Sequence, residues 1–413
     1  MKKKLRVKSY KLRILIFISS FFIINFSFLT PSYSKVYIDI TSPAFRKLPI
    51  SISYKGPEEA KEIAGIVEND LDFTGIFYPM DPDILGAEIK VKINVEVTEK
   101  LKADAIVFDL IKNKEILIKS YTAPRKILRA LAHSISNDIF SLLTGKEGIF
   151  RTKIAYTSSS SNKKWLYIFD WDGHNPSRIV SRGLSLSHTW SLDGWKMIYA
   201  SERKKNWNIY KLDLRNSSET ALFSSKGLNL VGGISPDNRI AFSSSKDGSS
   251  EIYVMNINGS SVKKLTRSFG IDVSPVFSPD GSQIAFVSDR GGSPQIYIMN
   301  SRGRRLKRLT FQGSYNTSPA WSPDGRWIAY VGRKNGKNQI FVIKSDSTEI
   351  RQLTDEGNNE NPTFSPNGMF IAFDSDRYGS KGIYLMNING ERQTRITPNG
   401  TKAMNPKWSP YFK

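Results

Sequence analysis

The sequence of 413 residues has no cysteine and only three histidines, and each scarcity excludes a class of chemistry. Without cysteine the chain can form neither disulfides nor a thiolate metal site, and it has no cysteine nucleophile. His133, His174 and His188 are not at metal-binding spacing, which leaves little for zinc or acid–base chemistry. The Gly-x-Ser-x-Gly turn of many serine hydrolases is also missing. The sequence therefore favours a binding protein over an enzyme.

The first 34 residues contain no acidic residue, which distinguishes this segment from the rest of the chain. Seven lysines and arginines precede an apolar run from Ile14 to Leu29, and the small residues Ser32 and Ser34 follow it. This is the pattern of a signal peptide, and cleavage after Ser34 would leave Lys35 as the new N-terminus. A retained membrane anchor is the alternative, although the run is shorter than the ~20 residues that a membrane span needs.

The formal net charge of +22 is high, and part of it belongs to this leader. The other basic residues are scattered, with no continuous basic block after residue 35. An excess of this kind can attract nucleic acid, anionic lipid or an acidic protein. Export makes nucleic acid the least favoured of these partners. We therefore interpret the lysines mainly as solubilising residues and expect no nucleic-acid partner.

A repeat of 43 or 44 residues occupies most of the chain after residue 150. Its clearest copy, residues 274–310, reads SPVFSPDGSQIAFVSDRGGSPQIYIMNSRGRRLKRLT. The serines that begin the Ser-Pro-Asp-Gly turn or a variant of it are Ser191, Ser235, Ser278, Ser322, Ser365 and Ser409. Each copy contains four short β-type runs, which is the content of one propeller blade. The second run, Ile284-Ala285-Phe286 in this copy, is entirely apolar, so we expect neighbouring blades to cover both its faces.

The two ends of the repeat region are complementary fragments. Residues 154–180 supply the second, third and fourth strands of a unit, whereas residues 404–410 supply only a first strand and its turn. Pairing them makes a composite blade, which closes the ring and removes free sheet edges. Five whole units and this composite predict a mostly β fold, a six-bladed β-propeller over residues 148–413, in which Trp408 shares a sheet with Ile154.

Aspartates of the repeated turns invite a catalytic interpretation. Asp237, Asp280 and Asp324 could form a ring of carboxylates, but proline and glycine in these segments fit a tight β-turn, so we favour a structural role. An exported hydrolase or lactonase with a metal ion in the propeller channel is the alternative function, because propeller channels bring polar groups together.

Residues 35–147 lack the repeat and predict a small α/β domain. Apolar residues at helical spacing indicate helices over 58–73 and 125–143, with Gly145 as a C-terminal stop. Strands are expected over 89–97, 105–111 and 115–121. We expect the apolar helix stripes to pack on that sheet, and His133 to be an ordinary surface or core residue rather than a ligand.

The geometry of a propeller predicts a binding face. Loops that enter the first strands lie on the same side as loops that join the second and third strands, and binding residues concentrate on such loops. The predicted partner-binding residues are Asp272, Arg290, Asn316, Thr317, Arg333, Asn358, Asn359, Glu360 and Arg377. Replacing Asp272, Asn316 and Glu360 together is expected to weaken a complex without altering thermal unfolding.

With this organisation, the sequence resembles the TolB family of the Tol–Pal envelope system over essentially the whole mature chain. The resemblance rests on the junction SNDIFSLLTGKEGIFRTKIAY (136–156), the PD40-type repeats and the terminal NPKWSPYFK (405–413). The junction is the most specific of the three, since similar turns occur in many exported propellers. Departures also exist: Leu192 replaces proline in one turn, and Asn238 and Asn367 alter two others.

The resemblance implies a periplasmic, non-enzymatic and monomeric protein without a cofactor. It would bind the peptidoglycan-associated lipoprotein at its propeller and TolA through its N-terminal segment and domain, and contact the membrane only through these partners. Its role would be in outer-membrane integrity and in constriction during cell division. The stretch that matches the position and alternating pattern of the family's N-terminal box is Lys35, Val36, Tyr37, Ile38, Asp39 and Ile40.

Overall fold

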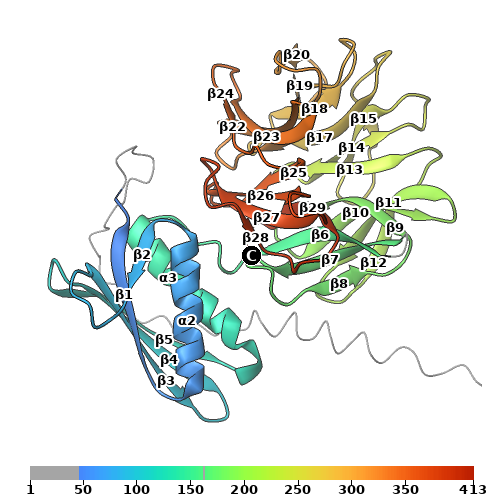
Figure 1. Cartoon of the computed structure of the whole chain (residues 1–413). Coiled ribbons are helices and arrows are strands. Elements are labelled where there is room, and N and C mark those ends of the chain that lie inside the picture. Colours follow the sequence, from blue (N-terminus) through green and yellow to red (C-terminus); the bar gives the residue numbers. More distant parts are fainter. Residues whose placement is uncertain (1–45, 161–162) are drawn as a thin grey trace, which may run out of the picture. The chain divides into compact units, whose positions relative to one another are not determined.

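The chain folds into two compact units, which divide between Arg151 and Thr152. The structure is a computed structural model that describes residues 46–160 and 163–413. The predicted signal peptide and residues 35–40 lie outside the described residues. The first unit is a small α/β domain, and the second is built from short strands arranged as the blades of a propeller (Figure 1).

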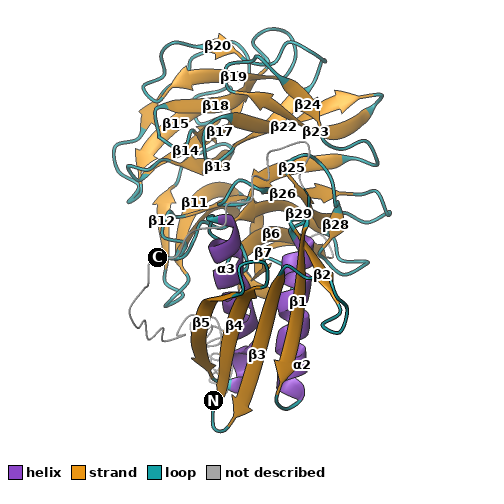
Figure 2. Ribbon diagram, turned by 90° about the vertical axis from the view of Figure 1, so that its left-hand side faces the viewer, coloured by secondary structure: helices purple, strands orange, loops and turns teal. Residues whose placement is uncertain are grey.

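The first unit is a five-stranded sheet with two helices on one face (Figure 2). Its strands lie in the order β2 (Phe77–Met80), β1 (Leu48–Lys55), β3 (Ile89–Val97), β4 (Leu101–Asp109) and β5 (Lys114–Ala123). Strand β1 runs parallel to β2 and β3, and β3, β4 and β5 are antiparallel. The helices are α2 (Glu58–Phe73) and α3 (Leu128–Thr144), and the 3-10 turn η1 (Arg125–Ile127) precedes α3.

Both helices follow the apolar spacing of the sequence. Ile63, Val67 and Leu71 of α2 are fully buried. Helix α3 ends at Gly145, whose φ of 70° is a left-handed conformation that glycine adopts without strain. The two predicted helices are confirmed, whereas β1 and β2 are additional to the predicted strands. Neither helix, nor any other in the described part of the chain, is long and apolar enough to cross a membrane.

His133 is a core residue of this unit. Its side chain on α3 is buried, and its Nδ1 atom lies 2.8 Å from Oδ2 of the buried Asp70 on α2. Buried polar groups are stable when they satisfy each other, so this contact joins the two helices.

Five blades of the propeller are consecutive in the sequence. They are β9 (Leu184–Trp190), β10 (Lys196–Arg203), β11 (Asn206–Asp213) and β12 (Glu219–Phe223); β13 (Asn229–Ile234), β14 (Arg239–Ser244), β15 (Glu251–Asn256) and β16 (Lys263–Lys264); β17 (Asp272–Phe277), β18 (Gln283–Ser288), β19 (Gln295–Asn300) and β20 (Lys307–Arg308); β21 (Asn316–Trp321), β22 (Trp327–Lys334), β23 (Lys337–Lys344) and β24 (Ile350–Gln352); and β25 (Asn359–Phe364), β26 (Phe370–Ser375), β27 (Gly382–Asn387) and β28 (Thr394–Arg395). Each is an antiparallel sheet in which consecutive strands are neighbours.

The sixth blade combines the two ends of the repeat region. Its strand order is β29 (Ala403–Trp408), β6 (Lys153–Ser160), β7 (Lys163–Asp170) and β8 (Ser177–Val180). Trp408 pairs with Ile154 across β29 and β6, as the sequence predicts. The indole Nε1 of Trp408 also donates a hydrogen bond of 2.8 Å to Oγ1 of Thr152. The ring is therefore closed by a composite blade, and the predicted six-bladed propeller is confirmed.

Neighbouring blades pack face to face through their all-apolar second strands. Ala241 of β14 belongs to a buried cluster that includes Phe277, Ile284 and Phe286 of the next blade, so the small alanine leaves room for larger side chains, as predicted. Gly232 permits an even closer approach, because a Cβ atom there would lie 1.9 Å from the carbonyl oxygen of Pro275. Small residues in these strands thus set how closely the blades pack.

Candidate functional site

The loop face of the propeller comprises the loops that enter β13, β17, β21 and β25 and the loops that join the second and third strands of the same blades. Hydrogen bonds connect the two kinds of loop. The backbone N–H of Ile271 donates to Oδ1 of Asp289 over 2.6 Å, and that of Asn358 donates to Oδ1 of Asp376 over 2.7 Å. Both kinds of loop therefore lie on one side of the ring, as the sequence predicts.

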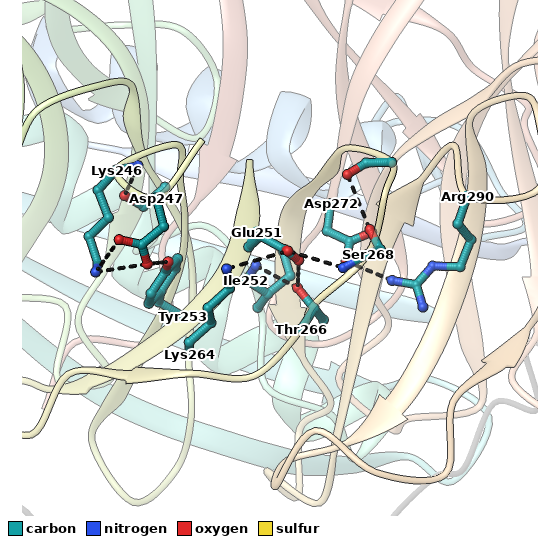
Figure 3. Close-up of polar contacts among 12 residues, drawn as sticks. Lys246, Asp247, Glu251, Ile252, Tyr253, Lys264, Thr266, Ser268, Asp272 and Arg290 are labelled. Atoms are coloured by element: carbon teal, nitrogen blue, oxygen red, sulfur yellow. Dashed lines mark hydrogen bonds and ion pairs between the residues drawn. The ribbon is translucent and has the colours of Figure 1, made fainter. Parts of the chain in front are cut away.

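Asp272 and Arg290 form an ion pair on the loop face (Figure 3). Asp272, at the start of β17, is fully buried, and its Oδ2 lies 2.6 Å from Nη2 of Arg290. The guanidinium group also lies over the rings of Phe286 and Tyr297. Loss of either charge would leave the other without its partner in a largely buried site, which is costly. The pair therefore anchors the loop after β18 to the start of β17.

A second buried network recurs from blade to blade. The hydroxyl of Thr310 donates to Oε1 of Gln295 over 2.8 Å and accepts a hydrogen bond from the N–H of Ile296 over 2.9 Å. Asn316, which starts the next blade, donates to the same Gln295 oxygen over 2.7 Å. The equivalent groups are Thr266 with Glu251, which Figure 3 shows, and Thr354 with Gln339 and Asn359. The network ties the blades that contain Gln295 and Gln339 to the first strand of the next blade.

The sequence contains a second periodic signal, which corresponds to this network. Glu251, Gln295 and Gln339 recur at the period of the turns, as do Thr266, Thr310 and Thr354. A polar residue that recurs at the blade period beside buried strands indicates a repeated internal hydrogen bond.

The predicted partner-binding residues differ in exposure. Asp272, Asn316 and Asn359 are buried, Arg290, Thr317, Asn358, Glu360 and Arg377 are half-buried, and Arg333 is exposed. Arg377 donates to Oδ1 of Asn359 over 2.9 Å, so it also supports a loop. This burial argues against the expectation that replacing Asp272, Asn316 and Glu360 leaves thermal unfolding unchanged, and we now expect a lower unfolding temperature. Partner contact by these residues stays a prediction.

The loop face also has exposed apolar side chains, which are not among the partner-binding residues predicted from the sequence. Phe269 is fully exposed, and Ile271, Phe311 and Tyr378 are each more than half exposed. They belong to loops that enter β17 and β21 and to the loop between β26 and β27. Scattered exposed apolar residues are normal, but several aromatic rings on one face of a rigid ring of loops favour protein binding.

The turn face, at the other ends of the strands, carries the Ser-Pro-Asp-Gly turns. The hydroxyl of Ser278 donates to Oδ1 of Asp280 over 2.5 Å and accepts a hydrogen bond from the N–H of Gln283 over 3.0 Å. Hydrogen bonds, first from Ser278 and then from Ser282, hold the pKa of Asp280 below its usual value. Asp237 and Asp324 accept the same bond from Ser235 and Ser322. These aspartates therefore have the structural role that the sequence predicts.

A cavity of about 290 Å³ lies in the propeller channel and is lined by first strands of all six blades. In one part of its wall, Nζ of Lys381 lies 3.2 Å from Oδ2 of Asp374 and also contacts Glu360. Burial raises the pKa of Asp374, whereas the charge of Lys381 acts to lower it. Across residues 46–160 and 163–413, no three histidine, aspartate or glutamate side chains are grouped in a way that could hold a metal ion.

Fold and site together define the class of this protein, a six-bladed β-propeller of Ser-Pro-Asp-Gly repeats with an N-terminal α/β domain. The chain belongs to the TolB family. Residues 140–412 match the family model of the TolB beta propeller domain, and residues 36–116 match that of the TolB amino-terminal domain.

Individual relatives agree with this assignment. The Tol-Pal system protein TolB of Desulfosudis oleivorans is 35% identical over 267 residues, which cover 57% of this chain and 61% of that protein. A TolB homolog of Chlorobium chlorochromatii is 33% identical over 247 residues, or 54% of this chain and 56% of that protein. The chain thus spans about six-tenths of the length of these curated relatives. The crystal structure of TolB from Acinetobacter baumannii superposes with a TM-score of 0.81 at 29% identity and covers 88% of this chain and 97% of that one.

Proposed function

We propose that this chain is a periplasmic, non-enzymatic docking protein of the Tol–Pal system. Its loop face binds the peptidoglycan-associated lipoprotein, and the segment 35–40 binds TolA. Through these contacts it maintains the outer membrane and assists constriction during cell division. Membership of the TolB family and the name of the Desulfosudis relative support this proposal.

The observation that carries the proposal is the construction of the loop face. Buried networks such as Asp272 with Arg290 hold the loops in place, while Phe269, Phe311 and Tyr378 remain exposed above them. Interface energy is concentrated in a few residues, among which aromatic ones are enriched. A rigid support also lowers the entropy lost on binding. The face therefore has both properties that a protein-docking surface needs.

The lipoprotein part of the proposal is tested with Phe269→Ser and Phe311→Ser combined. We expect affinity for the periplasmic domain of the lipoprotein, measured by calorimetry, to fall at least tenfold, which corresponds to about 1.4 kcal/mol. Thermal unfolding should change little, because both rings are exposed. Leu192→Ser, an exposed apolar residue of the turn face, is the matched control and should leave affinity unchanged. Equal affinities for all three proteins would contradict a role of the loop face.

The TolA part of the proposal is tested by deleting residues 35–40. We expect the deletion to abolish TolA binding in a calorimetric titration, while the affinity for the lipoprotein and the unfolding temperature of the propeller stay within error. Retained TolA binding would show that another part of the chain makes this contact, and it would leave the lipoprotein result unaffected.

A further inference from the structure

Part of the channel wall, formed by β6, β7, β9 and β29, contains polar groups without partners in the described part of the chain. Oγ1 of Thr157 and Oγ of Ser185 form no hydrogen bond there. Both side chains line the cavity, and neither is more than 1% exposed. Folded proteins seldom leave buried polar groups unsatisfied, so a group that this unit does not itself supply is expected beside them.

Two lysines face the same cavity. Lys164 on β7 and Lys407 on β29 both line it, and within the described ranges neither forms an ion pair with a carboxylate. Lys381 differs from them, because it contacts both Asp374 and Glu360. Lys381 is therefore directly ion-paired, whereas Asp374 acts on Lys407 only from beyond ion-pair distance.

Hydrogen bonds between β9 and β29 bring Lys407 close to His188. Nε1 of Trp190 donates to the carbonyl oxygen of Lys407 over 2.8 Å, and Nδ2 of Asn405 donates to that of Leu186, also over 2.8 Å. His188 lies between Leu186 and Trp190 along β9, so the two contacts bracket it.

The protonation states of these two groups leave a charged lysine beside a neutral imidazole. Burial lowers the pKa of His188 to about 3, with the charge of Lys407 acting in the same direction and the backbone of Ala155 opposing both. The imidazole is therefore neutral near pH 7, and its one N–H is directed to the backbone of Ala155. Burial also lowers the pKa of Lys407 to about 8, against the attraction of Asp374, so this lysine is still mostly charged at pH 7.

We propose that this part of the channel wall binds a small oxyanion, a carboxylate or a tetrahedral group such as sulfate, through Lys407 and Lys164, with Thr157 and Ser185 as hydrogen-bond donors. Ammonium groups and hydroxyls satisfy the oxygens of such a group, whereas a cation would be repelled by both lysines. A cavity of about 290 Å³ is at the lower limit of small-molecule sites, which begin at about 300 Å³, so it accommodates one such group rather than a peptide segment. The site does not depend on the docking function proposed above.

The test is calorimetric titration of the full chain with sodium sulfate, at an ionic strength held constant with sodium chloride. We expect saturable binding of one sulfate per chain and an affinity at least tenfold lower in Lys407→Met and in Lys164→Met. Lys307→Met is the matched control, because it removes the same charge from an exposed position on β20 and should leave affinity within twofold. If Lys407→Met does not fold, Lys164→Met and Ser185→Ala carry the test.

Two results would overturn the site: no saturable heat with the unmodified chain, or an equal loss of affinity in Lys307→Met and Lys407→Met. The source of the anion is resolved by comparing acetate with the blocked peptide acetyl-Gly-Glu-Gly-amide. Binding of the peptide at least tenfold tighter than acetate indicates an acidic side chain of a partner, and equal binding indicates a free ion. In both cases the site requires that the affinity falls in Lys407→Met or, if that variant does not fold, in Lys164→Met.

Discussion

The loop face and the turn face of the propeller are stabilised by contacts that span different numbers of residues along the chain. On the turn face, Ser278 bonds to residues two and five positions away. On the loop face, Gln295 bonds to Thr310 and Asn316, which are 15 and 21 positions away, and Asp272 pairs with Arg290 from the loop after the next strand. The turn-face bonds therefore shape one turn each, whereas the loop-face bonds connect strands and successive blades.

The comparison shows where the chain can carry variable residues. A turn that supplies its own hydrogen bonds needs the same few residues in every blade, so it has little freedom for recognition. In a loop that is held by the buried Asp272 or Gln295, the exposed side chains are not needed to hold the loop. Binding residues generally lie on loops positioned by a rigid scaffold. The exposed Phe269 and Phe311 follow this rule.

The largest effect should come from breaking the loop face at Asp272. Asp272→Ala leaves the Arg290 guanidinium without its carboxylate, and since Arg290 keeps some solvent exposure we expect a loss of about 2–4 kcal/mol in the free energy of unfolding. Urea unfolding measures this loss. The matched variant on the turn face, Asp280→Ala, removes an exposed carboxylate and should cost about 1 kcal/mol or less. Equal losses would mean that the two faces do not differ in this way.

The next effect concerns Lys407, in the channel wall between the two faces. Folding lowers its pKa from 10.5 to about 8, so between these values the unfolded chain binds more protons and stability rises with pH. Well below pH 8, Lys407 is protonated in both the folded and the unfolded chain, so the free-energy cost of burying its charge is constant. Since Lys407 borders the open channel, we expect Lys407→Met to gain about 1–2 kcal/mol at pH 7.

Urea unfolding at pH 7, 8, 9 and 10 checks this prediction. The unmodified chain should gain stability over the range relative to Lys407→Met, and the two curves should converge near pH 10. Lys307→Met, on an exposed strand, should keep the slope of the unmodified chain. Parallel curves for Lys407→Met and the unmodified chain would show that folding does not shift this lysine.

Much of the fold could be predicted because its strongest signals are periodic. The turn serines recur every 43 or 44 residues, and the fragments around Ile154 and Trp408 complete one unit, which predicts a closed ring. Strands β1 and β2 could not be predicted in the same way. Strand β2 is only four residues long and contains Pro79, and β1 pairs only with segments distant in the sequence, so local propensity contains little information about either.

The face of the candidate site could be predicted, but not the exposure of its residues. Polarity usually indicates exposure, yet Asp272 is buried because Arg290 compensates its charge, and Asn316 is buried because Gln295 and the backbone of Gln312 accept its hydrogen bonds. Phe311, an apolar residue directly after the buried Thr310, is exposed instead. The partners of Asp272 and Asn316 lie 18 and 21 positions away, beyond the range of local sequence patterns.

The smallest effect is expected on the turn face, at Ser278. Ser278→Ala removes the hydroxyl that joins Asp280 to the N–H of Gln283, and because this bond is local we expect a loss of about 1 kcal/mol in the free energy of unfolding. The same substitution should raise the pKa of Asp280 toward its usual value, since Ser278 is the first cause of its lowering. Titration of the Asp280 carboxyl carbon by NMR measures this shift, and Asp346, whose pKa is lowered by Thr348 in another loop, is the internal reference. A loss as large as that of Asp272→Ala, or an unchanged Asp280 titration, would show that the turn is held by more than its own residues.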